Sequence, residues 1–284
     1  MTKKRKKIIP VIIFFIGFSL CLYPLVSNLI ERQHQRNAVA TYNNSVKDAD
    51  DHKIEEELQK ANEYNLALFQ SGGTLIGEAN EILSEESYNS LLNMTDTGIM
   101  ANLEIPKINV SLPIYHGTSD EVLAAGVGHL SYSSFPIGGE NTRAILTGHR
   151  GLPNSKLFTR LDELEEGDLF FINVFEKTLA YKVIELEVIE PDEIDKLSIQ
   201  PGKDLVTLLT CTPYGINTHR LIVTGERVAY EESVKESIKG EMMSFREIVF
   251  ICIPFVFLIV AIILIIKNSK KNKKGVSKHE IKKN

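Results

Sequence analysis

Two long apolar runs frame the chain, and shorter runs fill the part between them. Residues 8–30 and 248–266 are almost wholly apolar, and the second run holds no charged or amide side chain. A helix of roughly 20 such residues crosses a bilayer, and a buried core helix rarely keeps this composition over that length. The pattern predicts two transmembrane helices. The first is expected to stay uncleaved, because bulky residues stand where a signal peptidase needs small ones.

The basic residues predict the orientation of these two helices. Five Lys or Arg residues precede the first run and eight lysines follow the second. Lys and Arg next to membrane helices remain on the cytoplasmic side. Both termini are therefore expected in the cytoplasm. Residues 1–30 comprise the N-terminal basic tail and the membrane anchor, and residues 267–284 form the basic C-terminal tail. Residues of about 31 to 246 are expected outside the membrane, and the lipid bilayer is a partner.

Between the membrane runs the periodicity changes once. Residues 31–69 are polar with apolar positions at helical spacing, which predicts a stalk helix or helical pair, and 78–92 is weakly helical. Short β-type runs then alternate with Gly and Pro, which predicts an all-β barrel or sandwich with brief helices at 120–125 and 155–164. The expected strands are 100–105, 110–115, 143–147, 169–175, 179–189, 205–210 and 219–228. The expected divisions are a stalk and possible lid at 31–98, a β-domain at 99–230 and a linker at 231–247.

Charge narrows the possible partners. The overall net charge of −5 conceals an uneven distribution, because the stretch between the basic ends holds 19 Lys and Arg against 36 Asp and Glu, a balance of −17. Nucleic-acid-binding domains carry basic surfaces. An acidic external domain therefore argues against a nucleic-acid partner.

Cysteine usage singles out one residue. Cys21 and Cys252 lie inside the apolar runs, which leaves Cys211 alone in the external part. One cysteine can form neither a disulfide within that part nor a zinc framework, so no metal or cofactor is expected. Cys211 is then either a buried structural residue or a nucleophile.

A nucleophilic thiol needs a base beside it and a donor for the oxyanion that forms on the substrate. His149 follows an apolar run in LTGHRG, at a strand end between glycines, where scaffolds expose reactive side chains. His116 has a similar setting and stays a candidate, whereas His129 suits a structural role. Arg220 opens the run that follows the Cys211 strand, so a hairpin would bring it near the sulfur. His219 and Arg220 point to opposite faces of that strand, and only one can face the site.

These residues carry a resemblance. The segment TLLTC with an arginine nine residues further on, and TGH upstream, is similar to the signature of the sortases, membrane-anchored cysteine transpeptidases of Gram-positive bacteria. The similarity covers residues 99–228. Longer blocks resemble the pilin-polymerising class C sortases: LEIPKINVSLPIYHGTS, GVGHL, GGENTRAILTGHRGLP, KLFTRLDEL and TLLTCTPYGINTHRL. The C-terminal membrane run is also a class C trait.

The resemblance implies a mainly β fold, an eight-stranded β-barrel with short helices, beside the N-terminal helical stalk and two transmembrane helices. It implies that Cys211 attacks the Thr–Gly bond of an LPxTG-like sorting signal, that His149 transfers protons and that Arg220 stabilises the oxyanion or the threonine carbonyl. The implied partners are pilin subunits or surface proteins with such signals, and an amine acceptor. A pilin lysine makes the enzyme a pilus polymerase. A cell-wall cross-bridge amine is the alternative, and a non-catalytic membrane-tethered adaptor is a third.

One departure from class C concerns the lid. Class C sortases usually cover the cysteine with a lid that carries an Asp-Pro-aromatic triplet, but no proline occurs between Pro24 and Pro106. Any cover must come from residues 71–92, with Tyr88 or Leu91 as contacts. We therefore expect an open groove.

Overall fold

The protein is described by a computed structural model that covers residues 5–72, 81–94, 97–240 and 243–280. It divides into two compact units. One combines Met1–Ser27 with Met243–Asn284, and the other is Asn28–Met242. The first unit contains the apolar helices and the second contains the folded domain.

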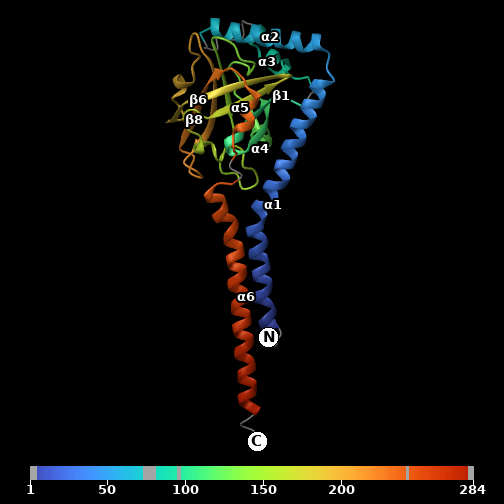
Figure 1. The fold of residues 1–284 in the computed structure, drawn as a ribbon, viewed down its shortest axis with the longest axis vertical. Helices are drawn as coiled ribbons and strands as arrows, with labels where there is room; N and C mark the ends of the chain where they lie inside the picture. The colour runs from blue at the N-terminus through green and yellow to red at the C-terminus, as the bar shows by residue number, and fades with distance from the viewer. Residues whose placement is uncertain (1–4, 73–80, 95–96, 241–242, 281–284) are drawn as a thin grey trace. The chain divides into compact units, whose positions relative to one another are not determined.

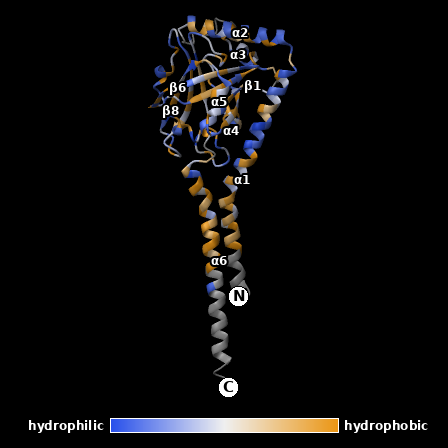
Figure 2. Ribbon diagram, in the orientation of Figure 1, coloured by the Kyte–Doolittle hydropathy of each residue, from blue (hydrophilic) through white to orange (hydrophobic). Residues whose placement is uncertain are grey.

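The apolar runs form helices, as the hydropathy pattern predicts. α1 (Arg5–Lys47) begins in the first unit, and α6 (Phe245–Glu280) continues well beyond the apolar run. Figure 2 shows hydrophobic colouring along the described apolar part of each helix. The segments Ile12–Lys47 and Phe245–Ile263 are long and apolar enough to cross a membrane. Two candidate membrane helices, one near each end of the chain, are therefore compatible with membrane anchoring.

The folded domain is a closed barrel of eight strands (Figure 1), which confirms the predicted barrel and rejects a sandwich. The strand order is β1-β2-β3-β4-β7-β8-β6-β5, and β5 returns to pair with β1. The pairs β2–β3 and β4–β7 are parallel, and the other six are antiparallel. The strands are β1 (Ile99–Ile105), β2 (Val110–His116), β3 (Val127–His129), β4 (Thr142–Thr147), β5 (Leu169–Val174), β6 (Lys177–Ile189), β7 (Asp204–Thr212) and β8 (His219–Val228).

The predicted helical pair packs into the same core as the barrel. α1 ends at Lys47, and Asp50 caps the next helix, α2 (Asp51–Gln70), by accepting a hydrogen bond from the backbone N–H of His52. α2 crosses one end of the barrel (Figure 1). The Tyr42 hydroxyl of α1 donates to the carbonyl of Met100 and accepts from the Phe175 N–H. Its buried companions in the core are Val46, Ala61, Tyr64 and Leu68.

Short helices complete the domain, and one prediction about them is wrong. The helix expected at 120–125 is confirmed, but 155–164 forms turns and a single 3₁₀ turn instead of a helix. The Phe158 N–H donates to the carbonyl of His149, and Leu157 has a φ of 37°, so tertiary contacts replace the helical ladder. The short helices are α3 (Glu85–Ser90), α4 (Asp120–Ala125), α5 (Glu232–Ser237), and the 3₁₀ helices η1 (Glu81–Leu83), η2 (Pro106–Ile108), η3 (Leu161–Glu163) and η4 (Ile194–Leu197).

Candidate active site

The two faces of the β4–β7–β8 sheet differ in chemistry. Side chains alternate between faces along a strand. On the inner face lie apolar residues of the barrel core: Ala144, Leu146, Val206, Leu208, Leu221 and Val223. On the outer face, the Thr207 and Thr224 hydroxyls lie 3.2 Å apart and Arg143 Nη2 lies 3.5 Å from the Thr224 hydroxyl. The outer face therefore carries polar side chains beside apolar ones such as Ile145 and Ile222.

The register places Arg220 opposite Cys211. β7 and β8 pair antiparallel with Cys211 facing Arg220 and Thr212 facing His219. Directly paired residues share one face of a sheet, so the guanidinium and the thiol lie on the outer face together. His219 belongs to the other face, where Nε2 lies 3.1 Å from the Glu190 carboxylate. Of the two residues that sequence left open, Arg220 is the one beside the sulfur.

Arg220 keeps most of its donors available. Its Nη1 donates to the carbonyls of His219 at 3.1 Å and Asn217 at 3.4 Å. The other guanidinium N–H groups have no partner among the described residues. Cys211, His149 and Arg220 are all partly exposed, so a ligand can reach them.

His149 is held level with Cys211 by the parallel pairing of β4 with β7. The last register pair is Thr147 with Leu209, and the Gly148 N–H donates to the Leu209 carbonyl at 3.1 Å. The Thr210 hydroxyl donates to the Gly148 carbonyl at 2.7 Å. Continuing this register by two further pairs, Gly148 with Thr210 and then His149 with Cys211, brings His149 beside Cys211.

Glycines let the histidine loop pack tightly. A Cβ on Gly148 would lie 2.9 Å from the Phe158 ring, so a side chain there would displace the ring. Gly151 has a φ of +84°, and a Cβ there would lie 3.3 Å from the ring of Tyr214 in the β7–β8 loop. The loop after β4 and the loop after β7 therefore contact each other across the site.

Sequence reasoning missed Arg150, which ties these two loops together. Its side chain is 4% exposed, and its Nη2 lies 2.6 Å from the Asp162 carboxylate. Its Nη1 donates to the Thr212 hydroxyl at 3.0 Å. Arg150 follows His149 and Thr212 follows Cys211, so this bond fixes the spacing of the two candidate residues. Its position in LTGHRG was the only available signal.

A hollow lies on the outer face of β4, where Arg143 and Ile145 line it. It has a volume of about 280 Å³. Its wall includes the β6–β7 connection, which Arg143 holds by donating from Nη1 to the carbonyls of Lys196 at 2.6 Å and Ser198 at 2.9 Å. The lining residues are Phe69, Gly72, Tyr132, Ser133, Arg143, Ile145, Leu197, Ser198, Ile199 and Pro201.

The other candidate histidines make structural contacts: His129 lies in the core, and His116 is partly exposed. His129 is fully buried, its Nε2 lies 2.8 Å from the Ser134 carbonyl and its Nδ1 lies 3.0 Å from the Tyr88 hydroxyl. Burial lowers the pKa of His129 to about 4. Both ring nitrogens of His116 face backbone carbonyls, and burial also lowers its pKa. The structural role expected for His129 agrees with these contacts.

Only part of the segment predicted to cover the site belongs to the described residues. Residues 73–80, the middle of the proposed cover, lie outside the described residues. Tyr88 is 4% exposed, and its hydroxyl accepts from the Gly117 N–H and contacts His129. Leu91 is also buried in the core. Both side chains are thus committed to other contacts. Among the described residues, no group of three or more His, Cys, Asp or Glu could hold a metal ion.

Comparison with known proteins identifies the family of the folded domain. A sortase-domain family model matches residues 103–228. Sortase D of Bacillus subtilis is 36% identical over 129 residues, which is 44% of this chain and 62% of that protein, so the match spans less than two thirds of its length.

Solved structures give longer matches. Sortase C1 from Streptococcus agalactiae has 44% identity and a TM-score of 0.65, over 69% of this chain and 100% of that one. A Clostridium perfringens sortase C, solved with the C-terminal cell wall sorting motif, has 42% identity and a TM-score of 0.60, over 68% of this chain and 99% of that one.

Proposed function

The chain belongs to the sortase family, and on that premise we propose that it is an extracytoplasmic cysteine transpeptidase that polymerises pilins. Cys211 is the nucleophile, His149 the general acid and base, and Arg220 the oxyanion donor. The substrate is an LPxTG-like sorting signal, and the acceptor is the side-chain amine of a pilin lysine. The observation that carries this proposal is the pairing of Cys211 with Arg220 at a strand end, with His149 in the loop that directly follows the neighbouring strand β4.

The first half-reaction cleaves the signal. The Cys211 sulfur, as thiolate, attacks the carbonyl carbon of the threonine, and the carbonyl oxygen becomes an oxyanion. Arg220 donates hydrogen bonds to that oxygen, since its fork has N–H groups to spare. The C–N bond then breaks, His149 as imidazolium gives its proton to the departing glycine amine, and a thioester remains on Cys211.

The second half-reaction joins the acyl group to an amine. The lysine nitrogen attacks the thioester carbonyl, and Arg220 again stabilises the oxyanion. His149 accepts the proton that the attacking amine loses, and the C–S bond breaks to release the thiolate. The product is an amide between the threonine and the lysine, and the enzyme returns to its starting protonation state.

The hollow on β4 suits the peptide that precedes the cleaved bond. Ile145 lies four residues before His149, about 13 Å along an extended strand. Four extended residues of an LPxT segment cover the same length. With the threonine carbonyl at Cys211, the leucine end would reach the apolar side chains Ile145, Leu197 and Ile199.

The proposed topology puts both termini in the cytoplasm and the barrel outside. Its support is the pair of candidate membrane helices and the basic residues next to them. Cysteine accessibility tests it in intact cells. In a C211A background, a cysteine placed in an exposed barrel loop should react with a membrane-impermeant reagent, and one in the C-terminal tail should not.

A competition between acceptors tests the function. The full-length chain in detergent is incubated with a sorting-signal peptide, a candidate pilin and an oligoglycine amine, and mass spectrometry identifies the amide. A peptide–pilin lysine linkage supports polymerisation. A product with oligoglycine alone favours the anchoring of surface proteins to a cross-bridge. No thioester and no amide, with C211A and the unaltered chain alike, would leave only the adaptor alternative.

A further inference from the structure

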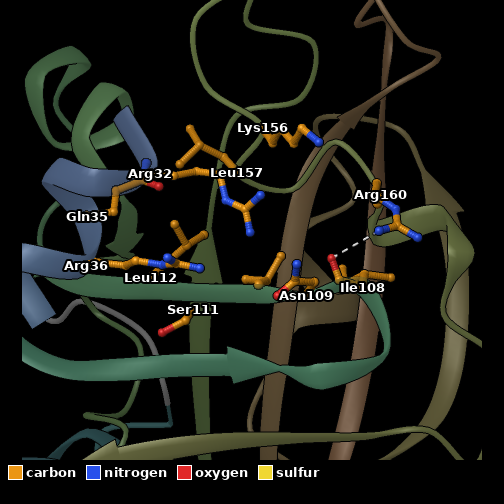
Figure 3. Close-up of a pocket in the computed structure, with 11 residues that line it drawn as sticks. Arg32, Gln35, Arg36, Ile108, Asn109, Ser111, Leu112, Lys156, Leu157 and Arg160 are labelled. Atoms are coloured by element: carbon orange, nitrogen blue, oxygen red, sulfur yellow. Dashed lines mark hydrogen bonds between the residues drawn. The ribbon is translucent and has the colours of Figure 1, made fainter. Parts of the chain in front are cut away.

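A cavity away from the candidate active site lies between α1 and the connection from β1 to β2 (Figure 3). It has a volume of about 60 Å³. At roughly 10–15 Å³ for each water-sized group, this holds about four to six such groups, the size of one tetrahedral oxyanion. The lining residues are Arg32, Gln35, Arg36, Ile108, Asn109, Val110, Ser111, Leu112, Lys156, Leu157 and Arg160.

The cavity concentrates positive charge in an acidic domain. Four of its lining side chains are Lys or Arg, and none of the described residues that line it is acidic. The stretch of chain between the basic ends holds only 19 basic residues against 36 acidic ones. In a domain with this excess of acidic residues, a patch of average composition would contain acidic side chains among the basic ones. The described residues that line the cavity instead include basic side chains and no acidic ones.

The arginines of the cavity differ in their contacts with the rest of the protein. Arg160 is fixed, because Nη2 lies 2.7 Å from the Glu163 carboxylate and Nη1 donates to the Ile108 carbonyl at 3.3 Å. Arg32 and Arg36 take part in no ion pair within the described part of the chain. They stand four residues apart on α1, where like charges repel. An anion between them would relieve that repulsion.

The cavity also offers neutral hydrogen-bond donors. Asn109 adopts a left-handed backbone conformation with a φ of 54°, which turns the chain at the cavity wall, and Ser111 is exposed beside it. Figure 3 shows the Arg32 and Arg36 side chains extending from α1 toward this connection. Planar guanidinium forks, an amide and a hydroxyl are the donors that bind phosphate oxygens.

The position of Arg32 in the chain indicates where the phosphate comes from. Arg32 follows Ile30, the last residue of the apolar run, by two residues. Two residues of chain reach at most about 7 Å, so a membrane crossed by that run brings lipid headgroups within reach of the cavity. Basic residues next to a membrane segment attract anionic headgroups.

We propose that this basic cavity binds a phosphate group, and that its source is the headgroup of an anionic phospholipid. Arg32 and Arg36 are the principal ligands, with Lys156 and Arg160 adding positive charge. The site is independent of the transpeptidase reaction, since none of its residues belongs to the candidate active site. A lipid headgroup bound in the cavity would hold this part of the folded domain at the bilayer surface.

Lipid titration of the full-length chain in a neutral detergent tests the proposal. Short-chain phosphatidylglycerol, phosphatidylcholine and inorganic phosphate are added separately, and the unfolding temperature is followed. The test variant is R32Q/R36Q. The matched control is K47Q/K53Q, which removes the same charge from exposed positions of α1 and α2 outside the cavity.

We expect phosphatidylglycerol to stabilise the unaltered chain and the control equally, and to bind R32Q/R36Q about tenfold more weakly. Phosphatidylcholine should stabilise less. A response to inorganic phosphate that equals the lipid response would keep the phosphate site but assign it to a free anion. If the double variant does not fold, the single change R36E at an exposed position replaces it. Equal lipid affinity of cavity variant and control overturns the proposal.

Discussion

Two regions of the barrel contain histidine in opposite settings. The first, the aromatic–histidine cluster, consists of Tyr64, Tyr88, His116, His129 and Phe135. The His129 ring lies parallel to the Phe135 ring at 5.5 Å and is fully buried. The second region is the strand-end site with His149, Cys211 and Arg220, all partly exposed. One region is enclosed by rings, and the other opens to solvent.

The difference lies in the hydrogen-bonding capacity that remains. Both ring nitrogens of His129 are occupied by contacts with protein atoms, and burial lowers its pKa, so the ring stays neutral and has no nitrogen available to a substrate. In the strand-end site, the main-chain atoms of His149 and Gly148 carry the structural bonds, which leaves the imidazole to substrate. A histidine is thus suited to catalysis when its backbone, and not its ring, holds it in place.

The largest expected effect comes from removing Cys211, the proposed nucleophile. C211A should abolish thioester and amide formation, because the other two cysteines, Cys21 and Cys252, lie in the apolar runs. The unfolding temperature should change little at this partly exposed position. Mass spectrometry of the acyl enzyme measures it. C252A, which alters a cysteine in the apolar run of α6, is the control and should remain active. Cross-linking of pilin by C211A at the normal rate would contradict the assignment.

The next largest effect is expected at Arg220, the proposed oxyanion donor. R220K should lower kcat/KM by about 10²–10³-fold, or about 2.7–4 kcal/mol, because an ammonium cannot replace a planar fork. Steady-state kinetics with a sorting peptide measures this loss. H219Q is the matched control on the adjacent residue, and it should lose little activity since His219 pairs with Thr212 on the other face. Near-normal turnover of R220K would make Arg220 a structural residue.

The aromatic–histidine cluster should respond to pH in stability. The pKa of His129 is about 4 in the folded chain against an ordinary value of 6.5, so only the unfolded chain gains a proton between these values. The free energy of unfolding should be constant from this source above pH 6.5. It should fall by up to about 3 kcal/mol as the pH drops toward 4, and then level off. Burial shifts His116 in the same direction.

Denaturant unfolding from pH 7 to pH 4 measures this loss. H129Q should be less stable at pH 7 but should lose less stability on acidification than the unaltered chain. H34Q, a change on the exposed side of α1, should keep the full pH dependence. An unchanged slope in H129Q would show that the buried ring does not carry the effect.

Arg143 should affect substrate binding more than chemistry. R143M keeps the aliphatic stem but loses the bonds to the Lys196 and Ser198 carbonyls that hold the wall of the hollow. We expect KM for the sorting peptide to rise about tenfold with kcat nearly unchanged. R160M removes a buried arginine away from the hollow and should leave KM unaltered. An equal fall of kcat in R143M would place Arg143 in the chemical step.

The smallest expected effect concerns the proposed cover. Replacing residues 71–83 with a Gly-Ser linker should change the rate at which Cys211 reacts with a small thiol reagent by less than tenfold, since Tyr88 and Leu91 are committed to the core. Both proteins are compared at one pH, because the thiolate fraction alone alters the rate. An acceleration of tenfold or more would show a closed site.

The sequence predicted elements that depend on local pattern. Seven strands and the helix at 120–125 were found because alternation and turn residues mark them. β3 was missed because it has three residues, one of them glycine, and is a strand only through its pairing with β2 and β4. The prediction of a helix at 155–164 was wrong because the apolar spacing there reflects burial and not helical periodicity. The buried residues of this segment include Leu157, Phe158, Leu161 and Leu164.

The candidate site shows the same limit. Cys211, His149 and Arg220 could be named as candidates from residue type and setting, and the register of β7 and β8 then places Cys211 opposite Arg220. Arg150 could not be assigned, because its partner Thr212 lies 62 residues away. Contacts at that separation are set by the parallel pairing of β4 with β7, which no local pattern encodes.

Closure of the barrel has a consequence for the proposed reaction, in which the substrate is an extended peptide. A sheet with a free edge strand presents unpaired N–H and C=O groups, to which any extended peptide can add as another strand. In the described domain β5 returns to β1, so every strand of the sheet has a neighbour on both sides. Unfolded or extended substrates therefore find no backbone template on the sheet, and selection falls to the side chains around the thiol.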